Sequence, residues 1–206
     1  MYQKVTTTDI EFFKKVVGSN NVFSETEIHE EYSHDEMVYY GKYLPEVVLK
    51  VKTDQEISEI LKYCNEKSIP ITPRGSGTGL CGGCVALHGG VVLSLEKMKK
   101  IIEIDQKTMT VVIEPGVLLM ELADTVEALD LFYAPDPGER SATVGGNVVT
   151  NAGGMRAVKY GVTKDYVKGV EVVLANGEIL KFGGKTNKNS SGYNLKDLMI
   201  SSEGTL

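Results

Sequence analysis

Pro73-Arg-Gly-Ser-Gly-Thr-Gly-Leu80 is the stretch of this chain that restricts its structure most strongly. It follows an apolar run, Ile69–Thr72, whose composition predicts a β-strand. Successive backbone N–H groups with few side chains in the way can form a concave anion-binding site. Ser76 and Thr78 add hydroxyl donors, and Arg74 adds a nearby positive charge. The stretch predicts a loop that binds a phosphate or pyrophosphate, with a plain tight turn as the structural alternative.

The residues before this loop predict a small βαβ unit. Glu46–Val51 has the composition of a strand, and Thr53 and Glu56 form a capping box that opens the helix leading to the next strand. Apolar residues at helical spacing predict a further helix over Thr8–Val17, within an N-terminal segment, residues 1–45, that is otherwise irregular.

The residues after the loop follow a different pattern. Three short apolar runs, Gly90–Leu95, Ile101–Ile104 and Met109–Glu114, are separated by turns, which favours antiparallel pairing. Leu118–Leu129 has the spacing of a helix, and glycine-rich Thr143–Ala152 predicts a short helix followed by a loop.

Asn176-Gly177 lies between two further strand-like runs and predicts a hairpin with a type I′ turn. We therefore expect an α+β fold of two subdomains. Residues 46–85 form the small βαβ unit, and residues 86–206 form a larger, mostly antiparallel sheet with flanking helices.

Composition excludes several classes of protein. The chain has 206 residues, 42% of them hydrophobic, and a formal net charge of −6. An acidic chain lacks the basic face of a nucleic-acid binder, and no apolar run approaches the length of a membrane span. No apolar segment follows the first residues as in a signal peptide, and three cysteines do not suggest a disulfide framework. We expect a cytoplasmic protein.

Glycine is unevenly distributed. Of 22 glycines, seven fall between Gly75 and Gly90 and six between Gly138 and Gly161. Such clusters mark places where the backbone takes unusual dihedral angles or approaches something closely. The second cluster, within Pro135–Gly154, brackets small and amide side chains and could lie flat against a planar ring or be a close-packed connection. Two such clusters in one chain favour a ligand held by backbone groups.

Two glycine motifs resemble nucleotide-binding signatures without the required context. Gly77–Gly82 fits G-x-G-x-x-G, but no helix of normal length follows, so it is not a dinucleotide-binding turn. Gly184-Lys-Thr186 resembles the end of a P-loop, but Ile179 stands where that motif requires glycine.

Cys81, Cys84 and His88 could suggest a metal or redox site. A structural zinc site usually has four ligands, and a thioredoxin-like CxxC opens a helix. Neither context is present, so we interpret the cysteines as small packing residues and expect no metal. His29 and His34 likewise have no acid–base partner at a suitable spacing.

Taken together, the motifs resemble the FAD-binding domain of the vanillyl-alcohol oxidase and p-cresol methylhydroxylase flavoproteins. The branch that contains the flavin-binding component of glycolate oxidase and the FAD-linked D-lactate dehydrogenases is the most similar. The resemblance extends from about residue 35 to the end and is carried by Pro73–Leu80, Asp136–Gly154, Lys159–Gly161, Val170–Glu178, Ser191–Leu195 and Ser202–Leu206.

The resemblance implies FAD as cofactor, in a cleft between two subdomains. The first loop would hold the pyrophosphate, later residues the flavin and ribityl chain, and Val170 the adenine through backbone groups. Some family members bind flavin covalently through a histidine in the first loop; Thr78 and the absence of histidine there imply non-covalent FAD. The implied cofactor-binding residues are Pro73, Arg74, Gly75, Ser76, Gly77, Thr78, Gly79, Leu80, Pro135, Asp136, Thr143, Gly145, Gly146, Asn147, Asn151, Ala152, Gly153, Gly154, Tyr160, Gly161 and Val170.

The resemblance also implies an activity, oxidation of a D-2-hydroxy acid such as glycolate or D-lactate by hydride transfer to FAD. The partners would be this small acid and an electron acceptor, which could include partner subunits. The family's catalytic residues lie in a later substrate domain, so we expect an amino-terminal part of a longer enzyme, without a catalytic residue of its own. Another reaction of the same flavoprotein class and a non-catalytic flavin-binding module are the alternatives.

Overall fold

The computed structural model describes residues 2–37, 39 and 41–206 and divides into two compact units. The first unit runs to Met98 and includes Val173–Ile179, and the second consists of Lys99–Val172 and Leu180–Leu206. The expected boundary between residues 85 and 86 is wrong. Strand β4 (Val91–Ser94) belongs to the first unit, because its hydrogen-bonding partners are the strands on both of its sides there.

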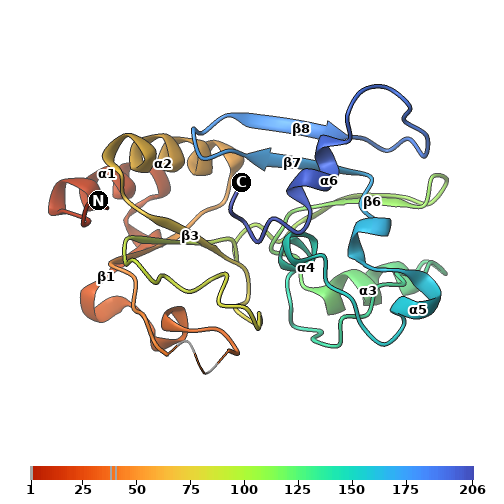
Figure 1. Ribbon diagram of the computed structural model, residues 1–206, viewed down its shortest axis with the longest axis horizontal. Helices are drawn as coiled ribbons and strands as arrows, with labels where there is room; N and C mark the ends of the chain where they lie inside the picture. The colour runs from red at the N-terminus through yellow and green to blue at the C-terminus, as the bar shows by residue number, and fades with distance from the viewer. Residues whose placement is uncertain (1, 38, 40) are drawn as a thin grey trace. The chain divides into compact units, whose positions relative to one another are not determined.

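The first unit is built on a four-stranded sheet in the order β1-β2-β4-β3 (Figure 1). The other strands are β1 (Val22–Ser24), β2 (Val47–Lys50) and β3 (Ile71–Arg74). β4 lies between β2 and β3 and is parallel to both, which corrects the expected antiparallel pairing. All four β4 residues are buried, as is typical of an inner parallel strand. The predicted βαβ pattern is confirmed, but its two strands are not neighbours.

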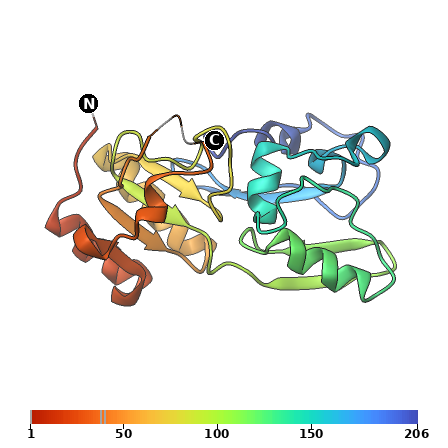
Figure 2. The same ribbon diagram turned by 90° about the horizontal axis from the view of Figure 1, so that it is seen from below.

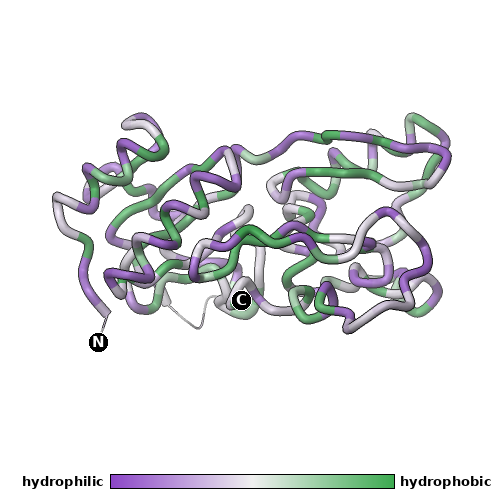
Figure 3. Tube along the Cα trace, turned by 90° about the horizontal axis from the view of Figure 1, so that it is seen from above, coloured by the Kyte–Doolittle hydropathy of each residue, from purple (hydrophilic) through white to green (hydrophobic). Residues whose placement is uncertain are grey.

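Successive side chains of the strands point to opposite faces of the sheet and contribute to two separate hydrophobic cores. Helices α1 (Thr7–Val17) and α2 (Asp54–Lys67) cover one face of the sheet, and the segment after β1 covers the other (Figure 1). Green and purple alternate along both helices in Figure 3, as expected for helices with one buried face. The helix-side core includes Phe13, Val47, Leu49, Ile60, Val91 and Leu93, and the opposite core includes Tyr32, Val48, Ala86 and Val92.

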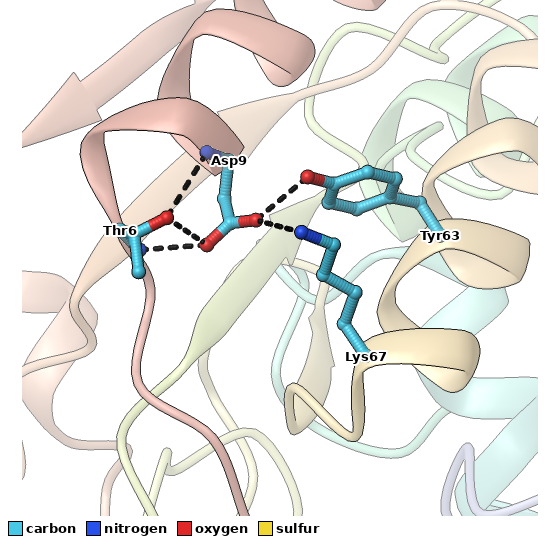
Figure 4. Close-up of polar contacts among 4 residues, drawn as sticks. All are labelled: Thr6, Asp9, Tyr63 and Lys67. Carbon is cyan, nitrogen blue, oxygen red and sulfur yellow. Dashed lines mark hydrogen bonds and ion pairs between the residues drawn. The ribbon is translucent and has the colours of Figure 1, made fainter.

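A buried carboxylate joins the two helices of the first unit (Figure 4). Asp9 accepts hydrogen bonds from the backbone N–H and the hydroxyl of Thr6, at 2.7 and 2.6 Å, which caps the start of α1. Tyr63 Oη donates to Asp9 at 2.6 Å, and Lys67 Nζ lies 3.3 Å from it, both from α2. Burial by itself would raise the pKa of Asp9, but these hydrogen bonds outweigh burial and lower the pKa to about 2.

The start of α2 differs in one bond from the predicted capping box. Thr53 Oγ1 accepts the Glu56 N–H at 3.2 Å, as expected. The Glu56 carboxylate, however, accepts the N–H of Lys52 at 2.7 Å rather than that of Thr53. Both side chains of the motif therefore cap the amino-terminal end of α2, but the Glu56 carboxylate binds the N–H one residue earlier in the chain than the motif predicts.

The second unit is built around an antiparallel hairpin of β5 (Ile101–Asp105) and β6 (Thr110–Ile113), as the sequence predicts. Helix α3 (Leu119–Glu127) lies along this hairpin (Figure 2). Its buried face meets the hairpin and the short helix α4 (Val144–Thr150) in one core. Helices α5 (Ala157–Tyr160) and α6 (Leu195–Met199) complete the unit.

Strands β7 (Gly169–Val173) and β8 (Ile179–Gly183) form the predicted second hairpin. Its turn is not type I′, because Gly177 has a positive φ (+80°) and Asn176 does not. The tip also packs on α2: Ser58 Oγ donates to the Gly177 carbonyl at 2.5 Å, and a Cβ on Gly177 would lie 2.7 Å from the Ser58 carbonyl oxygen. Glycine is needed here for its conformation and for this close approach. No helix in the described part of the chain is long and apolar enough to cross a membrane.

Candidate functional site

The glycine loop after β3 presents unused backbone donors. No N–H from Gly75 to Leu80 donates to an acceptor within residues 2–37, 39 and 41–206. Ser76, Gly79 and Leu80 are exposed, and Thr78 is half-buried. These six consecutive N–H groups have no acceptor among the described residues and could donate to a bound anion.

Pro73 places this loop at an edge of the sheet. β3 is the outermost strand beside β4, and proline, which has no N–H to donate, is confined to edge strands or bulges. The loop therefore follows an edge strand of the sheet.

Arg74 does not point into the loop's exposed side. Its side chain is only 6% exposed, and its guanidinium donates to the carbonyl oxygens of His34 at 2.8 Å and Glu31 at 2.7 Å. It lies directly against Gly77, where an added Cβ would overlap it. Arg74 thus lies beneath the loop as a buried cation, not as the freely accessible charge that the sequence suggests.

A polar cluster occupies the carboxyl ends of the parallel strands. Lys50, Ser94 and Arg74 are aligned in register at the ends of β2, β4 and β3. Glu96 Oε1 lies 2.6 Å from Lys50 Nζ, and Glu96 Oε2 accepts from Tyr32 Oη at 2.9 Å. Burial and the bond to Glu96 raise the pKa of Tyr32, so its hydroxyl stays protonated as a donor. Sequence reasoning missed this cluster because it joins residues 32, 50 and 96.

The cysteines after the loop are free thiols in the described structure. Cys81 is exposed, and Cys84 lies 3.3 Å from the Arg74 guanidinium. Burial raises the pKa of the Cys84 thiol, although Arg74 acts in the opposite direction. A neutral thiol is a poorer nucleophile than a thiolate. The described residues contain no cluster of three potential metal ligands.

In the second unit, the structure brings together two segments that the sequence singled out separately. Gly154 lies against the backbone of Asp136 and Pro137, so closely that an added Cβ would overlap the Asp136 carbonyl oxygen. Arg156 Nε lies 3.3 Å from the Asp136 carboxylate, which ties the same two segments together. The glycine at 154 is required by this contact and leaves both backbones in one surface region, where Gly153 and Gly154 are exposed.

The amino-terminal amides of α4 are already used by the protein. Val144 N–H donates to the Val117 carbonyl and Gly145 N–H to the Pro115 carbonyl, at 2.8 and 2.9 Å. Gly146 N–H donates to Thr143 Oγ1 at 3.2 Å. A Cβ on Gly145 would lie 2.6 Å from Pro115 Cβ. Thr143 and Gly145 therefore position this helix. The N–H groups of Val144, Gly145 and Gly146 are not free donors like those of the first loop, and Thr143 Oγ1 acts here as an acceptor.

The segment after α4 is held by Thr163, which sequence reasoning missed. Thr163 is fully buried, and its hydroxyl donates to the Ala152 carbonyl at 2.7 Å. Asn151 Oδ1 accepts the Lys164 N–H at 3.0 Å, and the Ala152 N–H reaches the Asn147 carbonyl at 2.8 Å. A threonine eleven residues from its partner gives no sequence signal, because only folding brings the two together.

The remaining predicted residues are dispersed in the second unit. The Tyr160 ring packs edge-on against Phe132, and its carbonyl accepts from Tyr166 Oη at 2.8 Å. Gly161 ends α5 with φ +83°. Val170 lies on β7, with its backbone within the hairpin.

The histidines contribute no acid–base pair. His34 Nδ1 lies 3.1 Å from the Asp35 carbonyl oxygen, and the His88 ring lies 5.1 Å from that of Tyr2. No described histidine forms an ion pair with a carboxylate within 4.0 Å, so none has the orienting partner of a general base.

The chain is similar in sequence to a known protein family and to several curated proteins. Residues 45–183 match the family described as FAD binding domain. The chain is 53% identical over 205 residues to a D-lactate dehydrogenase of Anaerostipes hadrus, and 48% identical over 176 residues to the GlcD subunit of glycolate oxidase of Bacillus subtilis. These alignments cover 100% and 85% of this chain, but only 43% and 37% of the relatives.

The fold is also similar to that of a solved structure. Crystalline p-cresol methylhydroxylase with substrate bound matches with a TM-score of 0.75 and 26% identity, over 97% of this chain and 42% of that one. The expected α+β, two-subdomain architecture is thereby confirmed at the level of the fold. The chain spans about two fifths of the length of the proteins it matches.

Proposed function

Because the chain belongs to the family of FAD-binding domains, we propose that it is the FAD-binding part of an enzyme that oxidises a small D-2-hydroxy acid. The relatives' names, D-lactate dehydrogenase and a component of glycolate oxidase, support this class of substrate. Bound FAD would supply the hydride acceptor for such an oxidation, while the protein supplies binding, orientation and electrostatics.

The main support is the run of backbone N–H groups from Gly75 to Leu80, which donate to no acceptor in the part of the chain that the structure describes. Its donors fit the pyrophosphate of FAD, whose oxygens accept several N–H bonds at once. The Ser76 and Thr78 hydroxyls are two further donors at the same loop. The buried charge of Arg74 beneath the loop adds a favourable potential for an anion.

For the second unit, we propose that the backbone near Asp136 and Gly154 contacts the flavin ring system. Support comes from the close approach of these two segments and from the exposure of the glycines there. The other residues proposed for the flavin and its chain are Pro135, Thr143, Gly145, Gly146, Asn147, Asn151, Ala152, Gly153, Tyr160 and Gly161, with Val170 for the adenine.

The chain's own contribution is binding rather than proton transfer. None of its described histidines is oriented by a carboxylate. We therefore place the base that takes the hydroxyl proton in the part of the longer relatives that this chain does not span.

Equilibrium titration tests the cofactor assignment. Purified chain is titrated with FAD, and the visible absorption and the quenching of flavin fluorescence are followed, with riboflavin as a probe that lacks the pyrophosphate. We expect saturable binding of FAD and much weaker binding of riboflavin. Equal binding of the two would refute the role of the loop, and no binding of FAD would refute the proposed function.

Substrate class is tested on a longer form of the protein that also contains the region its relatives possess. With an artificial electron acceptor, D-lactate and glycolate should be oxidised and L-lactate should not. A form with bound flavin that oxidises neither acid would indicate a non-catalytic flavin-binding module.

A further inference from the structure

The glycine loop is held by a segment that lies before the matched family region. Residues Glu31–Met37, which we call the clasp, contact the loop at several points, while the family match starts at residue 45. Building on the proposed function, we propose that the clasp preorganises the loop for FAD, with Arg74 and Asp35 as its positioning residues rather than as phosphate ligands.

Arg74 anchors the clasp from below the loop. Its two bonds go to clasp carbonyls, those of Glu31 and His34, and its guanidinium carbon lies 5.5 Å from the centre of the Tyr32 ring. The guanidinium also lies directly against Gly77, where an added Cβ would overlap it, so the same side chain contacts both the clasp and the loop. A planar group with two directed bonds is better suited than an ammonium to join two carbonyls.

Asp35 anchors the clasp to the far end of the loop. It is 4% exposed; one carboxylate oxygen accepts the Gly82 N–H at 2.8 Å, and the other accepts the Met37 N–H at 2.8 Å. Next to it, the Glu36 N–H donates to the Gly79 carbonyl at 3.0 Å. The loop is thus fixed on both sides of its free amides, which lowers the ordering cost of binding.

Because Asp35 is negatively charged, electrostatic repulsion and positioning of the loop predict opposite changes in FAD affinity when this charge is removed. A buried carboxylate lies 3.6 Å from the Cβ position of Gly79, and its charge alone would repel a phosphate in the loop. If simple electrostatics governed binding, Asp35→Asn would bind FAD more tightly. If Asp35 positions the loop, this variant binds FAD more weakly, because an amide has a single acceptor oxygen and its NH2 group would face one of the two N–H donors, of Met37 or Gly82.

The experiment measures the Kd for FAD of wild type, Asp35→Asn, Arg74→Lys and the charge-matched control Glu27→Gln, whose side chain is exposed. We expect about tenfold or greater weakening for Asp35→Asn and Arg74→Lys, equivalent to about 1.4 kcal/mol per tenfold, and less than twofold change for the control. Arg74→Lys keeps the charge but not the two directed guanidinium bonds, so near wild-type binding would overturn the positioning role of Arg74. Equal or tighter binding by Asp35→Asn would overturn that of Asp35.

Amide hydrogen exchange on the chain without FAD provides a separate readout. We expect the Gly82 N–H to be protected in wild type and to exchange faster in Asp35→Asn, while amides in the α2 helix stay unchanged. Unchanged Gly82 exchange would refute the clasp even if FAD affinity falls. If wild type does not bind FAD, the proposed function fails, and this measurement still decides whether the clasp holds the loop.

Discussion

Replacing Asp9 by asparagine should remove a pH-dependent part of the stability of the first unit. The carboxylate is 2% exposed and bonded to Thr6, Tyr63 and Lys67 (Figure 4). Its pKa is lowered from 3.8 to about 2, nearly two units at about 1.4 kcal/mol each. The folded state therefore gains about 2 kcal/mol from ionised Asp9 at neutral pH.

Because folding lowers the pKa of Asp9, the stability that Asp9 contributes falls as the pH is lowered. A carboxyl whose pKa is lower in the folded state stabilises the protein fully above its unfolded pKa, and this contribution is lost as the pH falls through the folded pKa. Wild type should be more stable than Asp9→Asn by about 2 kcal/mol at pH 7, and the difference should shrink between about pH 4 and pH 2.

Urea denaturation at several pH values, followed by circular dichroism, measures this difference. Glu11→Gln is the matched control, because it removes an exposed carboxylate from the same helix whose bond to Lys14 is at the surface. A difference between wild type and Asp9→Asn that stays constant from pH 7 to pH 2 would refute the reasoning. So would a loss no larger than that of the control.

Three further outcomes are expected. Gly154→Ala should lose about 1–3 kcal/mol of stability and bind FAD weakly, because the new methyl group meets the Asp136 carbonyl; Gly184→Ala, in open space, should change neither in the same melts and titrations. Thr163→Val should lower the free energy of unfolding by about 1 kcal/mol through the lost bond to the Ala152 carbonyl, as measured by urea denaturation. Acid precipitation of the FAD complex should leave all flavin in the supernatant, and flavin retained on the polypeptide would contradict non-covalent binding.

Much of the fold was predictable because its signals are local. The helix over Thr7–Val17 has its cap at Thr6 and its apolar face within one stretch of sequence. The glycine loop was likewise predictable, because its backbone donors and hydroxyls lie within eight consecutive residues. The antiparallel β5–β6 pairing follows from two short runs joined by a turn.

The errors concern partners that are distant in the chain. The sequence of residues 90–95 is compatible with a strand that pairs with the next run and with one that inserts between β2 and β3. In the structure the strand lies between β2 and β3, and all four of its residues are buried. Asn176-Gly177 predicts a hairpin correctly, but not the turn type, and not the contact of Gly177 with Ser58, which is more than a hundred residues earlier.

Residue type and spacing were enough to predict that a glycine loop rich in backbone donors follows a strand, and that a second glycine-rich region occurs in the same acidic chain. Neighbours along the chain settle such properties, so they can be read without a fold. Only the tertiary structure shows that Arg74 is buried beneath the loop. It also shows that Asp35 accepts the Gly82 N–H and that Glu36 N–H donates to the Gly79 carbonyl. The direction of a side chain and the identity of its partner depend on which distant backbone groups folding brings within hydrogen-bonding distance.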